Sequence, residues 1–486
     1  MFQFFHIKTM LPKAGNPKKN GTGKVRLSLT TKFSYGIGHV LNDFCASVWF
    51  SYFLIFFTKV LLFSPQLSGS VVLVGQLADC VATPFVGVMS DRGEGCRYGR
   101  RKTWHLFGTI MVICTYPFIY SPAVGLQDSE TWVKTLYYCF FIVLHQFAWA
   151  AVQISHLSLV PDLTPDEHER TALLAIRNSF TVIANMAVYL LLWGVLQVES
   201  ADPDQPITPG DSGKFQFVTY TTVVVGTITS ILFHLGVKER QQETLLPTED
   251  NVRTQQETGN STISLFTQFR LYQVAVLYMA TRLFANISQT IFPLYLHDNL
   301  MLGGQKIAIL PLVMYALSFV MSVLIKPLNK YFGRRVAYCF GAAVGIGVSV
   351  WVRLGEGDIY KSYLIYVVAG MYGISSSALL VTSLGITADL IGQDLNNGAF
   401  IYGLMSFCDK LSNGAFVMMI QSWPCFPSCS MHYRDSLAYV CGGAAVLGSI
   451  AVLTMCDTTP PVRDQLEEER PKEHEASNSS EVAVNA

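Results

Sequence analysis

The chain has 486 residues, of which 51% are hydrophobic, 12% aromatic and only 14% Asp, Glu, Lys or Arg. Soluble proteins carry about 25% charged residues, so this composition excludes a water-soluble protein of the same length. Lys plus Arg and Asp plus Glu both total 34, and this balance excludes recruitment of nucleic acid by net positive charge.

The charges lie in short blocks between apolar stretches of about 20 residues, the length that an α-helix needs to cross a bilayer. In chain order, these stretches predict six helices at residues 33–60, 66–90, 104–121, 132–160, 174–197 and 217–236. After a polar interval, six more are predicted at residues 268–296, 305–328, 336–354, 361–390, 399–422 and 436–456. The sequence therefore predicts an all-α polytopic membrane protein with twelve transmembrane helices in two halves, 33–236 and 268–456.

Polar segments flank and separate the two predicted halves. Residues 1–32 form a basic N-terminal tail, residues 237–267 a flexible linker, and residues 457–486 an acidic C-terminal tail. With both tails cytosolic, the tails and even-numbered turns hold 25 of the 34 Lys and Arg residues and the opposite side holds 7. This asymmetry predicts cytosolic tails and a cytosolic linker. The linker also contains a degenerate dileucine sorting pattern at Leu245 and Leu246.

The eleven cysteines do not form a disulfide scaffold, because most lie in or beside the apolar stretches. Cys425 and Cys429 are the one close pair on the predicted non-cytosolic side, where a bridge and two free thiols are both open. The sequence has no zinc-binding spacing, no phosphate-binding GxxxxGK[ST] loop, and neither an HExxH nor a GxSxG motif. It therefore predicts no metal, no cofactor and no enzymatic activity.

Two motifs occur once in each half. Gly99-Arg100-Arg101 follows the second predicted helix, and Gly333-Arg334-Arg335 follows the eighth. Asp162 follows the fourth predicted helix in Pro161-Asp162-Leu163, and Asp389 follows the tenth in Ala388-Asp389-Leu390. Two motifs repeated with similar offsets indicate a duplicated fold.

The first of these turns, residues 87–102, carries Asp91 and Arg92 before the Gly-Arg-Arg triplet, with a five-residue insertion relative to the general pattern. It resembles the signature between the second and third helices of the major facilitator superfamily. The resemblance implies that superfamily's fold, with a substrate site between two pseudo-symmetric halves. It also implies gating by charged residues at the cytosolic helix ends, namely Asp91, Arg92, Arg100, Arg101, Asp162 and Asp389.

Residues 35–44 (YGIGHVLNDF) and 79–84 (DCVATP) are similar to the cation-coupled glycoside symporter branch of the superfamily. Within that branch, residues 35–52, 153–161 and 380–392 most resemble a subgroup of lysosomal and melanosomal carriers needed for cysteine import and pigment chemistry. The resemblance covers nearly the whole chain except the tails and the linker. It implies a small-molecule substrate, with cysteine as the expected one.

Five charged residues lie far from water within the predicted spans: Asp43, Asp79, Arg282, Asp409 and Lys410. Isolated charges in hydrocarbon cost several kcal/mol unless they are paired or face a cavity, so these residues are functional candidates. Asp43 and Asp79 are suited to accept a substrate ammonium or to carry a proton. The alternative for both is a polar contact between helices.

Lys410 matches, through the resemblance, a lysine that links the cation and substrate sites of glycoside symporters. We expect it to neutralise Asp43 or Asp79 in the empty cavity; the alternative is a pair with the adjacent Asp409. Arg282, with Asn286 one turn later on the same face, predicts a clamp for a substrate carboxylate. A structural contact between helices is the other interpretation of these two residues.

His39 lies four residues before Asp43 on the same helix face and is the histidine best placed to carry a proton. The glycoside symporters have acids at the positions of Thr83 and Gln153. Losing two carboxylates leaves a weak oxygen cage for sodium, so the sequence favours proton linkage or no coupling ion.

These features predict an alternating-access carrier for cysteine in the lysosomal or melanosomal membrane, with the plasma membrane as the other location. A proton-linked carrier of sugars or lysolipid-like solutes is one alternative. A non-transporting organelle receptor or scaffold that uses its tails and linker is an alternative of another class.

Overall fold

The computed structural model describes residues 27–92, 98–164, 166–199, 205–239, 269–392, 398–423 and 431–455, and these residues are almost entirely helical. The N-terminal half contains α1 (Leu29–Ile37), α2 (Val40–Ile55), η1 (Phe56–Val60), α3 (Pro65–Arg92), α4 (Arg100–Ile119), α5 (Thr131–Leu163), α6 (Glu167–Glu199), η2 (Pro209–Asp211) and α7 (Ser212–Gly236). The C-terminal half contains α9 (Phe269–Leu294), η3 (Tyr295–Asn299), α10 (Gly304–Leu354), η4 (Tyr360–Leu364), α11 (Ile365–Gly392), α12 (Gly398–Ser422) and α13 (His432–Thr454). The all-helical prediction is confirmed.

The predicted helices differ from the observed ones at two joints. The predicted span 33–60 is divided into α1, α2 and η1, with α1 ending at Ile37 and α2 beginning at Val40. The predicted spans 305–328 and 336–354 lie in the single element α10, which bends at Gly333. Gly333 has φ +80° and its counterpart in the other half, Gly99, has φ +113°. The repeated Gly-Arg-Arg turns therefore both use the left-handed freedom of glycine.

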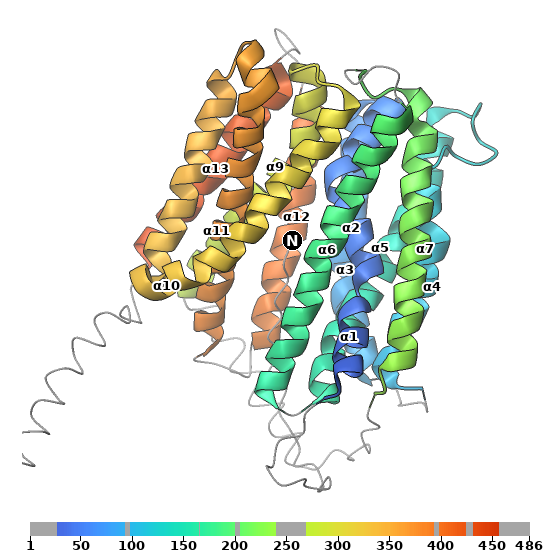
Figure 1. Ribbon diagram of the computed structural model, residues 1–486, viewed down its shortest axis with the longest axis vertical. Helices are drawn as coiled ribbons and strands as arrows, with labels where there is room; N and C mark the ends of the chain where they lie inside the picture. Colours follow the sequence, from blue (N-terminus) through green and yellow to red (C-terminus); the bar gives the residue numbers. More distant parts are fainter. Residues whose placement is uncertain are drawn as a thin grey trace, which may run out of the picture.

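The two halves stand side by side, with α1 to α7 on one side and α9 to α13 on the other (Figure 1). We call the end where α7 finishes and α9 begins the linker end, and the end that carries η1 and η3 the distal end. Contacts between the halves join the distal end: Tyr52 Oη donates to the Ala308 carbonyl (3.3 Å), and the Gly304 amide donates to the Gln205 carbonyl (3.0 Å). These contacts close the space between the halves on the distal side.

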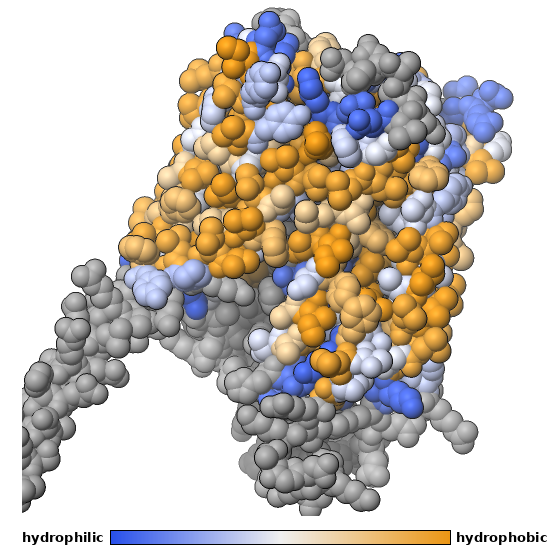
Figure 2. Space-filling model, viewed as in Figure 1, coloured by the Kyte–Doolittle hydropathy of each residue, from blue (hydrophilic) through white to orange (hydrophobic). Residues whose placement is uncertain are grey.

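On the face of the bundle seen in Figure 2, apolar side chains cover the middle and polar ones gather toward the ends. Large exposed hydrophobic residues occur on both halves, for example Phe140 (60% exposed), Ile228 (54%) and Val323 (57%). Within the described residues, nine helical segments are long and apolar enough to cross a membrane. Helices α9 and α12 are not among the nine, and they carry Arg282, Asp409 and Lys410. The intramembrane charges of the C-terminal half thus lie on these two helices.

Candidate functional site

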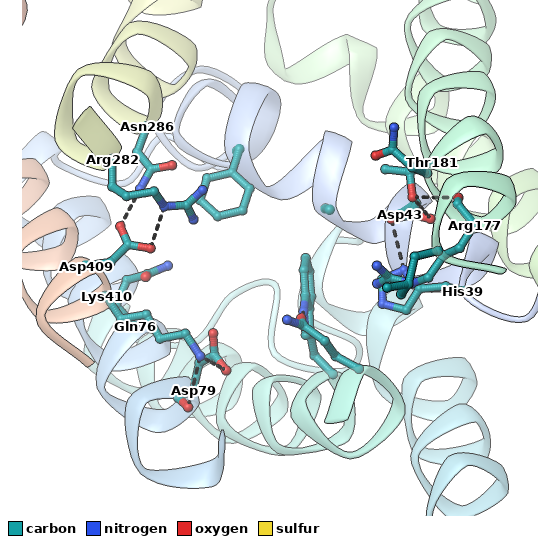
Figure 3. Close-up of a pocket in the computed structure, with 16 residues that line it drawn as sticks. His39, Asp43, Gln76, Asp79, Arg177, Thr181, Arg282, Asn286, Asp409 and Lys410 are labelled. Carbon is teal, nitrogen blue, oxygen red and sulfur yellow. Dashed lines mark hydrogen bonds and ion pairs between the residues drawn. The ribbon is translucent and has the colours of Figure 1, made fainter. Parts of the chain in front are cut away.

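A central cavity lies between the two halves, and its walls come from α2, α3, α5, α6, α9 and α12 (Figure 3). All seven residues predicted to bind substrate or carry a proton line it: His39, Asp43, Asp79, Gln153, Arg282, Asn286 and Lys410. The same wall also includes Asp409, Gln76, Trp149, Arg177 and Thr181. Residues far apart in the sequence therefore converge on one polar site inside an apolar bundle.

Asp43 and His39 form the first polar group, at the start of α2. His39 Nδ1 lies 3.0 Å from Asp43 Oδ1, and Thr181 Oγ1 on α6 donates to Asp43 Oδ2 (2.9 Å). Asp43 is 4% and His39 is 5% exposed. The i,i+4 spacing on one helix face brings the histidine onto the carboxylate as the sequence predicts. The Asp43 carboxylate thus has two donors and faces the cavity.

Lys410 and Asp79 form the second group and join the halves. Lys410 Nζ lies 2.6 Å from Asp79 Oδ1 and also donates to Thr83 Oγ1 (2.6 Å). Thr83 Oγ1 in turn donates to the Asp79 carboxylate (3.0 Å). We expected Lys410 to pair with Asp43 or Asp79, and the observed partner is Asp79. Lys410, Asp79 and Thr83 therefore form one closed set of contacts between α12 and α3.

Arg282 and Asn286 form the third group, with Asp409. Arg282 Nε lies 2.8 Å from Asp409 Oδ2, and Asn286 Nδ2 donates to Asp409 Oδ1 (3.0 Å). In this structure Arg282 and Asn286 hold a carboxylate of the protein, which is the contact between helices given as the other interpretation of these two residues; binding of a substrate carboxylate stays a prediction. The alternative pairing of Lys410 with Asp409 is wrong, because adjacent residues on a helix do not face each other.

Gln153 and Arg177 complete the polar wall. Gln153 Oε1 accepts a hydrogen bond from Trp149 Nε1 (2.8 Å), so it acts as a side-chain acceptor one turn from the indole. Arg177 on α6 was not expected to take part. Its Nε is buried without a hydrogen-bond partner, and the described residues provide no ion-pair partner for it. It lies near the start of its predicted span, and no sequence signal in that span marked it as a cavity residue.

The three groups occupy two sides of the cavity. Figure 3 shows Asp79, Lys410, Arg282, Asn286 and Asp409 on one side, and His39, Asp43, Thr181 and Arg177 on the other. The Lys410–Asp79 and Arg282–Asp409 ion pairs lie on the first side. On the second side the charges of Asp43 and Arg177 face the cavity without an ion pair between them.

The predicted gating residues lie near the linker end. Arg101 Nε lies 3.7 Å from Asp162 Oδ2, and Arg101 Nη1 donates to Ser90 Oγ (2.9 Å). The Glu239 carboxylate accepts from the backbone amides of Arg101 (3.1 Å) and Lys102 (2.9 Å), so it caps the positive end of α4.

Several predicted positions give no side-chain geometry. Arg100 is the first residue of α4. The side chains of Asp91, Arg92 and Asp389 and the pair Cys425 and Cys429 lie outside the described residues. The structure therefore tests neither these three gating residues nor the disulfide.

A polar, charge-paired cavity between two six-helix halves defines a secondary transporter of the major facilitator type. The chain belongs to the MFS/sugar transport protein family, whose model matches residues 34–421. It is 40% identical to major facilitator superfamily domain-containing protein 12 of Homo sapiens over 451 residues, covering 88% of this chain and 93% of the relative. These similarities confirm the predicted family and the prediction that the chain is a transporter and not an enzyme.

More distant similarities agree with the fold. The chain is 26% identical to the sphingosine-1-phosphate transporter MFSD2B of Mus musculus over 242 residues, about half of each protein (48% and 47%). The crystal structure of a D-xylose-proton symporter superimposes with a TM-score of 0.65 at 12% identity, covering 89% of this chain and 98% of the symporter. At that identity the superposition supports the major facilitator fold.

Proposed function

We propose that this transporter imports cysteine from the cytosol into lysosomes or melanosomes by alternating access, and that it supports pigment chemistry there. Two arguments support the proposal. The sequence resembles the subgroup of cysteine carriers, and the central cavity offers both charges that an amino acid requires. At neutral pH cysteine carries an ammonium, a carboxylate and a mostly protonated thiol.

The main observation behind the proposal is a difference between the two sides of the cavity. On one side the acids are paired with basic residues, whereas on the other side Asp43 and Arg177 do not pair with each other. Asp79 and Asp409 are already neutralised by Lys410 (2.6 Å) and Arg282 (2.8 Å). Asp43 is held by the Thr181 hydroxyl and by His39, and Arg177 has no ion-pair partner among the described residues. A zwitterion can therefore place its ammonium at Asp43 and its carboxylate at Arg177.

The Lys410–Asp79 pair supplies the coupling between solute and conformation in this proposal. Because the pair joins α12 to α3, it stabilises one arrangement of the two halves. A solute carboxylate that moves from Arg177 to Lys410 as the halves rearrange weakens this contact and favours the other arrangement. Such a differential contact is what a ligand requires to shift a conformational equilibrium.

The linker-end residues have gating roles in the proposal. The Arg101–Asp162 contact tethers α4 to α5 within the N-terminal half. We propose that Arg100, Asp91 and Arg92 act with it, and that Asp389 has the matching role in the other half. Charge-assisted contacts at helix ends are suited to two-state movements because they form or break as a unit.

A proton is the coupling ion that the cavity favours, because the positions of the two missing carboxylates hold Thr83 and Gln153, each in a hydrogen bond to a neighbour. The Asp43–His39 pair is the proposed proton carrier. Import into an acidic lumen is compatible with proton exchange in the opposite direction or with no coupling.

The test is exchange of labelled cysteine across vesicles that contain the purified protein, with Arg177→Gln as the variant. A charged hydrogen bond is worth about 1.5–3 kcal/mol, so exchange should fall by about tenfold to a hundredfold. Arg353→Gln is the matched control, because Arg353 pairs with Asp435 on the distal surface (3.1 Å) away from the cavity.

Competition separates the alternative substrates. Inhibition of exchange by unlabelled cysteine, and no inhibition by xylose or a lysophospholipid, supports the proposal. Transport of sugar or lysolipid but not cysteine would replace it with the alternative carrier. Full cellular function in an Arg177→Gln variant, lost when residues 237–267 are deleted, would indicate a receptor or scaffold.

The proposed location has its own test. A reporter protein that carries residues 237–267 should reach lysosomes through Leu245 and Leu246, because dileucine signals direct cargo to that organelle. A reporter that stays at the plasma membrane would favour the other location.

A further inference from the structure

The distal ends of α2 and α9 repeat the same backbone structure. Each helix ends in a five-residue π-helical turn, η1 (Phe56–Val60) and η3 (Tyr295–Asn299). The amides of Leu61 and Leu300 donate to the first carbonyl of their turns at 3.0 and 3.2 Å. The next residue in each half is a non-glycine residue with positive φ, Leu62 (58°) and Met301 (54°). Single π-turns are rare in proteins. Where they occur, they often lie at functional sites.

Lys59 and Asp298 are the fourth residues of these two turns, so they are equivalent positions of the duplicated halves. Their side chains meet: Lys59 Nζ lies 2.6 Å from Asp298 Oδ1 and 2.8 Å from Oδ2. Both side chains are about a quarter exposed (25% and 28%). Equivalent residues can touch only near the axis that relates the halves. The ion pair therefore fastens the distal end at its centre.

His297, next to Asp298, makes a second connection between the halves. Its Nδ1 lies 2.6 Å from Asp298 Oδ1, and its Nε2 lies 3.3 Å from the carbonyl oxygen of Ile207, which precedes η2 in the N-terminal half. A carbonyl oxygen and an ionised carboxylate only accept hydrogen bonds. Both ring nitrogens must then donate, and an imidazole has two N–H groups only when it is protonated.

The alternative place for this proton is the Asp298 carboxyl group. Burial raises the pKa of Asp298, but hydrogen bonds from His297 and Lys59, and their positive charges, outweigh burial and lower it below its ordinary value. The carboxyl group is therefore ionised over the pH range of cells. The proton that completes both hydrogen bonds belongs to His297.

Other charged groups near η3 are engaged elsewhere. Arg434 on α13 pairs with Glu356 (3.0 Å), and its amide donates to Asn299 Oδ1. Lys214 on α7 pairs with Asp211 (2.9 Å), and Lys306 lies at the start of α10. Lys59 is the charged group from the opposite half that contacts Asp298, and its charge is shared between both carboxylate oxygens.

We propose that His297 is a proton-binding site on the lumenal face, and that the bound proton holds the lumenal side of the transporter closed. The protonated ring bridges Asp298 of one half and Ile207 of the other, next to the Lys59–Asp298 pair. When the ring loses its proton, one of its two hydrogen bonds must break. Acid in the lumen therefore favours the state in which the cavity is not open to the lumen.

The sign of the pH dependence follows from the two groups. Asp298 has a lowered pKa in the closed state, so its contribution to closure is present at neutral pH and is lost only as pH falls through that lowered value. The contribution of His297 is present at acid pH, where both ring nitrogens carry a proton, and is lost as pH rises and one of these protons leaves. Closure is therefore strongest above the lowered pKa of Asp298 and below the pH at which His297 loses one of its two protons. This range includes the pH of an acidic organelle.

The experiment measures the distance between the halves by pulsed electron resonance. Spin-labelled non-natural amino acids replace Val124 and Ile359, which are 63% and 71% exposed in distal segments of opposite halves, so the eleven native cysteines stay in place. The full chain is studied in nanodiscs at pH 7.5 and 5.5. No transported solute is added, so the outcome is independent of whether cysteine is the substrate.

We expect the ratio of short to long distances to rise by up to about tenfold on acidification, because one proton contributes at most about tenfold per pH unit and the open state also takes up part of a proton over this range. The His297→Gln variant should change by less than about twofold, because glutamine does not titrate. The His297→Arg variant keeps a charge and two donors, and should stay closed at both pH values.

The His432→Gln variant is the matched control. His432 is another half-buried histidine of the distal side, and its Nε2 lies 2.7 Å from the Ile420 carbonyl oxygen; among the residues that the structure describes, no carboxylate contacts its ring. It should behave as the unaltered chain does. A distance distribution that is independent of pH in the unaltered chain, or a pH response that persists in His297→Gln, would overturn the proposal. If His297→Gln fails to fold, a pH response in the folded His297→Arg variant would overturn it equally.

Discussion

Lys410 of α12 and Asp79 of α3 meet across the boundary between the two halves, with 2.6 Å between the ammonium nitrogen and a carboxylate oxygen. The two side chains are only 10% and 14% exposed. A movement that separates α12 from α3 must break this pair or find new partners for both charges. We therefore expect the pair to be intact in the empty cavity and to weaken when a solute binds.

The first prediction concerns Lys410→Met, which leaves Asp79 as a buried charge without its cation. Removing one partner of a buried pair costs about 3–5 kcal/mol, so thermal unfolding should shift to a clearly lower temperature. The double variant Asp79→Asn, Lys410→Met removes both charges and should recover most of the lost stability. Equal destabilisation in the single and double variants would show that the pair is not the cause.

The second prediction concerns Asp409, which accepts from both Arg282 (2.8 Å) and Asn286 (3.0 Å) within the C-terminal half. Asp409→Asn leaves the Arg282 guanidinium buried without a counter-charge and should destabilise the protein by about 3–5 kcal/mol. Asn286→Ala removes one hydrogen bond and should cost only about 1–3 kcal/mol. Thermal unfolding of the two variants gives the order, and a larger loss in Asn286→Ala would contradict the charge argument.

The pairing of the intramembrane charges could be predicted from the sequence only in part. The i,i+4 spacing predicts the His39–Asp43 contact, because it depends on one helix alone. Which acid Lys410 meets depends on how α12 is rotated against α3, and that rotation is set by packing between distant segments. The neighbouring Asp409 points to a different helix, since successive residues of a helix diverge by about 100°.

The transmembrane spans could be predicted because each of them also depends on one helix alone. The apolar length of each helix follows from the thickness of the bilayer, so the predicted and observed helices agree within a few residues at most ends. Arg177 was missed because it lies near the start of its predicted span, where a basic residue also fits the positive-inside rule. Its role depends on the cavity that α6 faces, which no single helix reveals.

The third prediction concerns the close packing of α11 on α10. A Cβ atom at Gly373 would overlap the Met314 carbonyl oxygen, which is backbone and cannot turn away. Gly373→Ala should destabilise the protein by about 1–3 kcal/mol, the range for overpacking. Gly347→Ala, in α10, has nothing within 4 Å of the new Cβ and should be neutral or stabilising by up to about 1 kcal/mol. Equal unfolding temperatures for the two variants would contradict this packing.

The fourth prediction exchanges the charges of the distal pair. Because Lys59 and Asp298 are equivalent positions of the duplicated turns, the double variant Lys59→Asp, Asp298→Lys can restore an ion pair that each single variant replaces with like charges. The single variants should favour the lumen-open distance between Val124 and Ile359, and the double variant should return toward the closed one. In the double variant His297 has no adjacent carboxylate, so its pH response should be lost. A double variant as open as the single ones would show that the pair does not hold the halves together.

The measurement that tests the central claim is uptake of labelled cysteine into vesicles whose protein has its cytosolic face outward, at several lumenal pH values. The account predicts saturable uptake by the unaltered chain, a loss of about tenfold or more in Lys410→Ala, and a dependence on lumenal pH. Absence of cysteine uptake in folded, correctly oriented protein, or full uptake by folded Lys410→Ala, would contradict it.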